Sequence, residues 1–239
     1  MKYLDLTLPT PQHNLACDEV LLDLCEDGLE GEILRFWEPL EYFVVLGYSN
    51  KIGREINEVS CQTLRIPALR RPSGGGTVLQ GPGCLNFSLI LKIDGAAPLQ
   101  SITRTNTYIL DRHREALMSL AGPGVKVQGT SDLTVNNLKF SGNAQRRKRR
   151  ALLFHGTFLC SFDIPLIEKA LQMPPKQPDY RQNRTHTDFL TNVATSPAEI
   201  KKALKKCWGA KEELKKIPSQ KIEELVREKY SKEEWNYRF

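Results

Sequence analysis

The order of secondary-structure signals along the chain is the feature that most limits its fold. Strand-like runs follow one another directly, as at Ile33–Trp37 and Phe43–Gly47, and helical segments are interspersed among them. Two further runs, Asp132–Val135 and Leu138–Ser141, flank Asn136-Asn137, which tolerate positive φ and therefore predict a hairpin. This mixed order favours an α+β domain over a doubly wound parallel sheet.

Helical periodicity and cap signals complete the outline. Asn14 is suited to cap a helix from Leu15 to Cys25, because its side chain can accept a bond from the first turn. The 239 residues fit one good-sized domain, or one domain with a small appendage. Further helices are expected at Val59–Leu64, 103–120, Ile164–Leu171, Pro197–Cys207 and Ile222–Tyr230, and further strands into Arg70-Arg71 and at Thr77–Leu79, Leu85–Lys92 and Ala151–Phe162.

Composition narrows the compartment and the site chemistry. The chain has no run of eighteen apolar residues and no signal-peptide core after Met1, so we expect no membrane span and a cytoplasmic location. Its six cysteines are spread along the chain without a C-x-x-C pair, and its four histidines are scattered. These patterns predict reduced, mostly buried thiols and no zinc site.

Positive charge is concentrated in two places. The net charge of +6 comes largely from Arg146–Arg150 and from the lysine-rich stretch after Lys201. A basic balance suits either nucleic acid or an acidic protein partner. No recognised nucleic-acid motif accompanies it, so we expect no nucleic-acid partner. The run after Gln145 is interpreted as a solvated loop or as a docking surface near the rim of the active site.

A glycine run is the sharpest candidate for chemistry. Three consecutive glycines, Gly74-Gly75-Gly76, lie between strands and leave backbone N–H groups open to a phosphate or a carboxylate. Arg70 and Arg71 just before them can add charge-assisted hydrogen bonds. A tight turn beside two solvated arginines is the alternative. The run is neither a Walker loop nor a G-x-G-x-x-G fingerprint.

Two later segments add candidate polar groups. Lys139 precedes the small residues Ser141 and Gly142, beside which it could point inward and bind a developing negative charge. A solvated lysine is the alternative. His155-Gly156 lies within an apolar strand, where a histidine is either a hydrogen-bonded core residue or a catalytic one.

Taken in order, these segments resemble the lipoate–protein ligase A family, within the wider superfamily of lipoate ligases and octanoyltransferases. The similarity covers roughly residues 1–195. It rests on Asn14-Leu15-Ala16, Leu34-Arg35-Phe36-Trp37, Leu46-Gly47-Tyr48, Arg70-Arg71-Pro72-Ser73-Gly74-Gly75-Gly76, Gly83-Cys84-Leu85-Asn86-Phe87-Ser88, Ser131-Asp132-Leu133, Lys139-Phe140-Ser141-Gly142-Asn143-Ala144-Gln145, His155-Gly156-Thr157 and Asp188-Phe189-Leu190-Thr191-Asn192-Val193.

The resemblance implies a fold and a two-step reaction. The fold would be the catalytic domain shared with biotin–protein ligases, a central and mostly antiparallel mixed sheet flanked by helices. Lipoate would attack the α-phosphate of ATP to give lipoyl-AMP and pyrophosphate, and a lysine of a carrier would then take the lipoyl group. The carriers would be lipoyl domains of 2-oxoacid dehydrogenase E2 subunits or the glycine cleavage H protein. Mg²⁺ is expected with ATP, close to Asp132, and no metal held by the protein alone.

The resemblance also assigns residues. Lys139 would be catalytic, contacting both the α-phosphate and the acyl carbonyl oxygen, where positive charge stabilises both steps. The glycines would line the adenylate and acyl groups, with Arg71 approaching the phosphates. Substrate or nucleotide binding is expected of Arg71, Ser73, Gly74, Gly75, Gly76, Asn86, Asp132, Ser141, Gly142, His155 and Gly156.

Three departures from the family pattern qualify these roles. Gln80 stands where many relatives carry histidine, so we expect no proton transfer at that position. Ser131 replaces the asparagine of an N-D-L element. Residues 196–239 read as a short helical C-terminal extension rather than the full accessory domain of stand-alone ligases, so a separate polypeptide could supply that function.

The nearest alternative is an octanoyltransferase of the same superfamily. Such enzymes form a cysteine thioester without ATP. In the LipM- and LipL-type octanoyltransferases, the nucleophilic cysteine lies shortly before the lysine segment. The corresponding stretch of this chain, Val125–Leu138, contains no cysteine. Cys160 is expected to pack in the core, while Cys84 stays open because it lies near the glycines. A non-catalytic lipoyl-domain binder is a third class, which the intact glycine, arginine and lysine elements disfavour.

Overall fold

A mixed eight-stranded sheet forms the centre of the computed structural model, which describes residues 1–93, 95 and 97–239. β11 and β1 pair in parallel, as do β1 and β2, and every later pairing is antiparallel. The strand order is β11 (Glu212–Glu213), β1 (Lys2–Asp5), β2 (Ile33–Trp37), β6 (Cys84–Lys92), β10 (Ala151–Leu159), β9 (Leu138–Arg147), β8 (Asp132–Val135) and β7 (Lys126–Gln128).

A small second sheet lies beside one end of the large one. Its order is β4 (Ala68–Arg70), β3 (Phe43–Leu46) and β5 (Val78–Gln80), with β3 and β4 parallel and β3 and β5 antiparallel. The helices are α1 (Pro11–Glu26), α2 (Ile52–Glu55), α3 (Glu58–Thr63), α4 (Ile102–Ala121), α5 (Ile164–Ala170), α6 (His186–Phe189), α7 (Pro197–Cys207), α8 (Ser219–Leu225) and α9 (Glu233–Asn236), with short turns η1 (Ala97–Leu99), η2 (Asp179–Arg181) and η3 (Val226–Tyr230).

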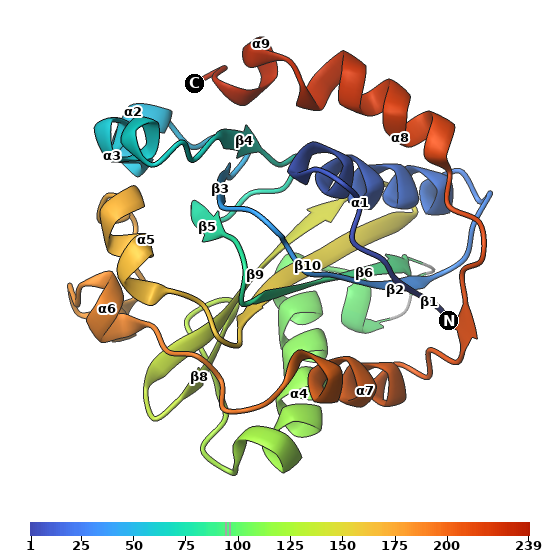
Figure 1. Ribbon diagram of the computed structural model, residues 1–239. Helices are drawn as coiled ribbons and strands as arrows, with labels where there is room; N and C mark the ends of the chain where they lie inside the picture. Colours follow the sequence, from blue (N-terminus) through green and yellow to red (C-terminus); the bar gives the residue numbers. More distant parts are fainter. Residues whose placement is uncertain (94, 96) are drawn as a thin grey trace.

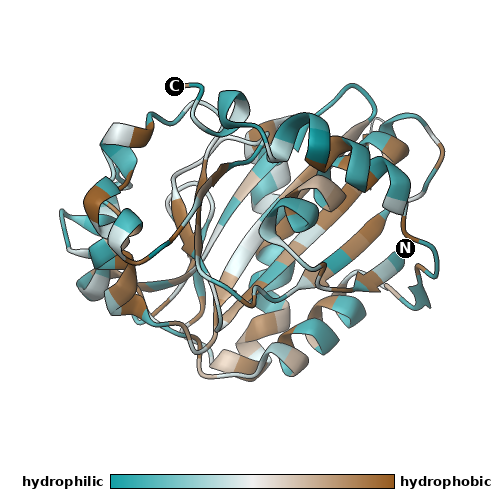
Figure 2. Ribbon diagram, turned by 45° about the horizontal axis from the view of Figure 1, so that its top comes forward, coloured by the Kyte–Doolittle hydropathy of each residue, from teal (hydrophilic) through white to brown (hydrophobic). Residues whose placement is uncertain are grey.

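Helices cover both faces of the large sheet. Figure 1 shows α1 and α8 over one face and α4 and α7 over the other. The apolar sides of these helices turn toward the sheet, and their polar sides toward solvent (Figure 2). β2 illustrates the consequence, because all five of its residues are buried. Its alternate side chains enter different cores: Ile33 and Trp37 pack with α1, and Leu34 and Phe36 pack with α4 and α7.

The predicted hairpin is confirmed. β8 and β9 pair antiparallel, and Asn136 and Asn137 form its turn with φ of 51° and 63°. The conformation suits asparagine, which tolerates the left-handed region better than most residues. β9 continues to Arg147, well past the predicted end at Ser141.

The predicted cap of the first helix is wrong. α1 begins at Pro11, because Thr10 accepts from the His13 backbone N–H and proline favours the first helical position. Asn14 is therefore inside the helix and buried. Its side chain amide donates to the Leu8 carbonyl and accepts from the Leu8 N–H, so it ties the helix to the preceding segment.

The residues after 195 wrap around the same sheet. Leu204 and Trp208 pack with the α4 core, and Ile222 and Leu225 pack with the α1 core. The boundary between 1–195 and 196–239 stays a prediction. Among the helices that the structure describes, none is long and apolar enough to cross a membrane.

Candidate active site

A cavity of about 470 Å³ opens on the α1 side of the large sheet. Strand register brings its floor together, because directly paired residues project to the same face. One row consists of Trp37, Asn86, Thr157 and Gly142 on four neighbouring strands. The next row includes Ser88, His155 and Ala144, and all of these residues line the cavity.

Arg71 shapes the glycine loop from inside. Its guanidinium is buried and donates to the carbonyl oxygens of Val45 at 3.2 Å, Gly74 at 2.7 Å and Gly76 at 2.7 Å. Burial lowers its pKa to about 10, and Glu55 opposes that shift. Arg71 also lines the cavity, but most of its hydrogen bonds stabilise the conformation of the glycine loop.

Arg70 does not enter the cavity, contrary to the prediction that it could bind the ligand. Its guanidinium turns to the other side of the loop, where it donates to the carbonyls of Gly47 and Asn50, both at 2.8 Å. The reason is strand alternation: consecutive residues at the end of β4 point in opposite directions.

The loop conformation requires glycine at its centre. Gly75 has φ of +89°, and a Cβ there would lie 3.0 Å from Arg71 Nη2 and 3.2 Å from Ala144 Cβ. Gly47 is equally constrained, since its Cβ would fall 2.2 Å from the Gly75 carbonyl oxygen. Cβ atoms at Gly74 and Gly76 would meet no described atom within 4 Å, so these residues face open space. Gly74 and Gly76 therefore leave room on the side where a side chain would project.

Lys139 points into the cavity, where Asp132 holds it. Its Nζ lies 2.8 Å from Asp132 Oδ1, and a quarter of its side chain is exposed. Gly142 makes the room, because a Cβ there would lie 2.8 Å from Lys139 Cε and Nζ. The other Asp132 oxygen accepts from the Tyr180 hydroxyl at 2.7 Å. The predicted inward lysine beside small residues is therefore present.

Asn86 belongs to a closed ring of three side chains. It donates to Gln80 Oε1 at 2.9 Å, Gln80 donates to Thr157 Oγ1 at 2.7 Å, and Thr157 donates back to Asn86 Oδ1. Both polar atoms of the Gln80 side-chain amide are thus engaged in hydrogen bonds within the ring. The ring stiffens the floor between β5, β6 and β10.

His155 lies under the glycine loop as a neutral hydrogen-bonding group. Its Nε2 is 2.6 Å from Ser73 Oγ, and Ser73 Oγ accepts from Arg71 Nε. Burial and then the charge of Arg71 lower the pKa of His155 to about 3. The Ser73 hydroxyl is therefore placed to donate to Nε2, and the pair links the loop to β10.

Gly156 and Ser141 line the cavity, yet their side-chain positions face the other core. A Cβ at Gly156 would collide with Asn143 Oδ1 at 1.9 Å, so Gly156 makes room for Asn143 rather than for a ligand. Ser141 pairs with Leu133 and Phe158, which belong to the α4 core. Its buried hydroxyl has no hydrogen-bond partner among the described residues.

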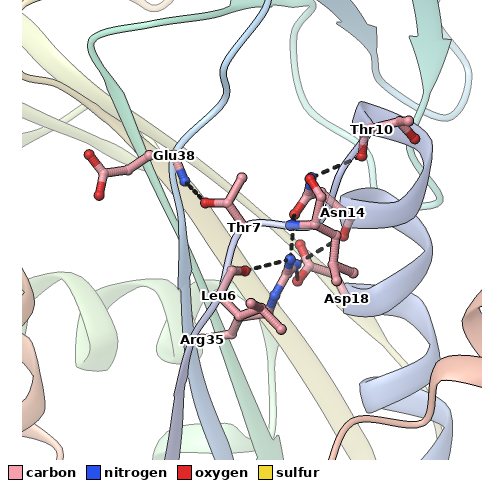
Figure 3. A network of polar contacts seen from close by, with 8 residues as sticks. Leu6, Thr7, Thr10, Asn14, Asp18, Arg35 and Glu38 are labelled. Atoms are coloured by element: carbon pink, nitrogen blue, oxygen red, sulfur yellow. Dashed lines mark hydrogen bonds and ion pairs between the residues drawn. The ribbon is translucent and has the colours of Figure 1, made fainter.

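The N-terminal half of α1 forms a roof, held by one buried arginine. Leu15 and Asp18 line the cavity from this helix. Arg35 donates to Asp18 Oδ1 and Asn14 Oδ1, both at 2.6 Å, and to the Asn14 carbonyl at 2.9 Å (Figure 3). These bonds explain why an arginine stands in the fully buried strand β2.

The outer wall contains residues that the sequence did not single out. Tyr180 and Arg181 come from η2 and His186 from α6, and Arg181 and His186 line the cavity. Arg181 stacks on Phe189, 4.7 Å from its ring centroid. Their loop after Pro174-Pro175 carries no spacing that points to a site, so only the fold reveals them.

No cysteine among the described residues lines this cavity. All six are free thiols. Burial raises the pKa of both Cys84 and Cys160 to about 12, so both are protonated near neutral pH. Cys84, which the sequence left open as a nucleophile, is buried in an apolar core.

The basic run follows the part of β9 that lines the cavity, since Ala144, two residues before Arg146, is a lining residue. Arg146 and Arg147 end β9, and eight residues of strand at roughly 3.3 Å each put Arg147 about 26 Å from Lys139. The hairpin that follows packs against the end of α1, where Glu26 accepts from the Arg150 N–H and Lys148 pairs with Asp23. The predicted solvated loop is confined to the turn after Arg147.

Comparisons with known proteins identify relatives of this chain. The family model for the lipoyl protein ligase A/B catalytic domain matches residues 10–207. Octanoyltransferase LipM of Brevibacillus brevis is 27% identical over 99% of this chain and 98% of its own.

Two solved structures share the fold. A lipoate-protein ligase A bound with ATP has a TM-score of 0.78 and 26% identity over 99% of each chain. A bi-partite lipoate protein ligase from Thermoplasma acidophilum has a TM-score of 0.80 and 23% identity over 99% of this chain and 96% of that one. The predicted α+β ligase-type fold is confirmed.

Proposed function

The chain belongs to the family of lipoyl protein ligase A/B catalytic domains, and we propose that it is an ATP-dependent lipoate–protein ligase. The observation that carries the proposal is the composition of the cavity. Among the described residues it is lined by Lys139 and by no cysteine. A ligase needs a cation near the reacting phosphate, whereas the alternative octanoyltransferase needs a thiol nucleophile.

In the first step a lipoate carboxylate oxygen bonds to the α-phosphorus of ATP, and the bond to pyrophosphate breaks. Negative charge builds on the phosphoryl oxygens during this exchange. Lys139 Nζ stands where it can bind such an oxygen while Asp132 keeps its side chain extended. The open N–H groups around Gly74 and Gly76 would receive the remaining phosphate or acyl oxygens.

In the second step the amine of a carrier lysine attacks the acyl carbon of lipoyl-AMP. The amide bond forms, and AMP and one proton leave. The charge that develops on the acyl carbonyl oxygen again needs a cation or N–H donors, which the same lysine and loop would supply. His155 is not the base, because its low pKa and its bond to Ser73 leave it weakly basic.

Mg²⁺ would arrive with ATP. Among the described residues there is no group of three or more His, Cys, Asp or Glu side chains that could hold a metal ion. Asp132 fits as a single protein ligand, since a carboxylate can accept more than its two present bonds from Lys139 and Tyr180. The ion would neutralise phosphate charge.

The carriers would be lipoyl domains of 2-oxoacid dehydrogenase E2 subunits or the glycine cleavage H protein. A second polypeptide could also assist the first step, a hypothesis supported by the bi-partite ligase of similar fold. Under it, the purified chain would transfer lipoate from preformed lipoyl-AMP yet make lipoyl-AMP slowly from ATP. Similar rates for both reactions in the lone chain would remove the need for a partner.

One assay separates ligase from transferase. The pure protein is incubated with a lipoyl domain and either ATP plus lipoate or an octanoyl carrier protein without ATP. A ligase gives AMP and modified carrier only in the first mixture. Carrier modification in the second mixture, with a thioester on Cys84 or Cys160, would move the protein to the transferase class.

A further inference from the structure

Arg70 is a hub that joins the end of the chain to the segment beside the glycine loop. Its guanidinium donates to carbonyl groups from both sides. On one side these are Gly47, Tyr48 and Asn50, at 2.8, 3.1 and 2.8 Å. On the other side they are Trp235 and Asn236, both at 3.2 Å. An arginine with fixed donors in one plane is suited to such bridging.

Two side chains of α9 also satisfy the backbone of Arg70. Asn236 Oδ1 accepts from the Arg70 N–H at 3.0 Å, and Trp235 Nε1 donates to the Arg70 carbonyl at 2.8 Å. Within the described part of the small sheet, β4 has only β3 as a strand neighbour. α9 therefore occupies the free edge of β4 at Arg70, the last residue of that strand. The ring centroid of Trp235 also lies 5.9 Å from that of Tyr48.

The segment 47–50 passes this restraint on to the glycine loop. The Tyr48 N–H donates to the Ser73 carbonyl at 2.8 Å, and Asn50 Nδ2 donates to Thr77 Oγ1 at 3.0 Å and to the Gly75 carbonyl at 3.3 Å. Arg71 holds the loop from inside. The glycine loop is thus held on one side by Arg71 and on the other by the segment 47–50, which in turn contacts Arg70 and, through Tyr48, α9.

We propose that Trp235 and Asn236 are positioning residues for the nucleotide-binding loop, acting through Arg70 and the segment 47–50. Neither residue lines the cavity, so neither contacts the substrate. Their effect is to hold the glycine N–H groups in one arrangement before ATP binds, which lowers the cost of ordering the loop on binding. The proposal rests on the proposed function only for its kinetic readout.

The structural test measures amide exchange in the full chain. The Tyr48 amide is the reporter, because it is bonded to the Ser73 carbonyl. Asn236→Ala and Trp235→Phe each remove one bond to the Arg70 backbone, and the second keeps an aromatic ring if the first fails to fold. The reporter should exchange about tenfold faster in both, equivalent to about 1.4 kcal/mol. Tyr237→Ala, at a half-exposed neighbour, is the control and should leave exchange unchanged.

The kinetic test uses the same variants. Both should raise the KM for ATP about tenfold while kcat falls less than threefold, because the loop is disordered but Lys139 is untouched. Unchanged Tyr48 exchange in two folded variants would overturn the proposal, as would faster exchange with an unchanged KM. If even the unaltered chain uses no ATP, the proposed ligase function is wrong. The amide-exchange result alone then decides whether Trp235 and Asn236 position the loop.

Discussion

Lys139→Ala tests the chemistry at the centre of the site. The substitution removes the one ammonium group that Asp132 holds against the cavity, with Nζ 2.8 Å from Oδ1. Loss of an electrostatic contact to a transition-state oxyanion typically costs about 3–4 kcal/mol, a rate factor of roughly 10²–10³. Because both steps develop negative charge at this point, we expect losses of this size in lipoyl-AMP formation and in transfer.

The fold should survive the change. The Lys139 side chain is a quarter exposed, so the lost ion pair should cost about 1–2 kcal/mol, between the values typical of exposed and buried pairs. Asp132 keeps its bond from Tyr180. Lys148→Ala is the matched control, since Lys148 is also paired, 2.6 Å from Asp23, but lies at the far end of the strand.

Two assays measure the effect separately. Pyrophosphate release with ATP and lipoate reports adenylation, and modification of a lipoyl domain by preformed lipoyl-AMP reports transfer. Circular dichroism and thermal unfolding check the fold. Near-normal adenylation by a folded Lys139→Ala protein would refute the reasoning, and equal losses in Lys148→Ala would show that the effect is general destabilisation.

Three further predictions concern the glycine loop, two cysteines and a buried histidine of α4. Gly75→Val should abolish ATP-dependent activity while the circular-dichroism spectrum persists, because the left-handed φ and the 3.0 Å approach to Arg71 exclude a branched side chain; a fully active variant would mean that the loop is only a turn. Cys84→Ala and Cys160→Ala, singly and together, should retain ATP-dependent ligation, and the native thiols should resist iodoacetamide, as their raised pKa values imply. Burial lowers the pKa of His113 to about 3, so only the unfolded state takes up its proton between pH 6.5 and 3. The stability contributed by neutral His113 is therefore fully present above pH 6.5 and falls by up to about 1.4 kcal/mol per pH unit below it. Urea titrations from pH 7 to 5 measure that slope. In a folded His113→Gln variant it should be smaller by the His113 contribution, while the contribution of His155, whose pKa is also lowered to about 3, remains.

The sequence predicted most of the large sheet because its signals are local. Strand-like runs identified the core strands, and Asn136-Asn137 identified the hairpin turn. β1, β7 and β11 were missed, since short strands carry little periodicity and obtain their stability from neighbours distant in sequence. The helix start at Thr10-Pro11 was missed because Asn14 resembles a cap, although its side chain serves a tertiary contact.

For the site, the sequence identified residues better than it identified their orientations. Lys139, Asp132, Gly75 and Gly76 line the cavity, because their loops and strand ends converge there, whereas the predicted Ser73 and Gly74 are not among its lining residues. The sequence did not indicate that Arg70 and Arg71 point to opposite sides of the loop. Arg71 supports the loop from inside and Arg70 from outside, a difference that depends on where β4 ends. The sequence did not predict the contact of Tyr180 with Asp132, because the two residues are 48 positions apart in the chain.

The position of the C-terminal tail, residues 196–239, restricts how an accessory protein could act. The apolar sides of α7 and α8 are already buried, with Ile200 and Leu204 in one core and Ile222 in the other. Lys201 pairs with Asp5 and Glu38, which leaves outward-facing lysines such as Lys202 for a partner. A partner could therefore dock on the tail through charge rather than through a shared core, and such binding should weaken as salt rises. α9, by contrast, already contacts the segment that supports the glycine loop. A partner that orders this loop would then act most directly by stabilising α9, without entering the cavity.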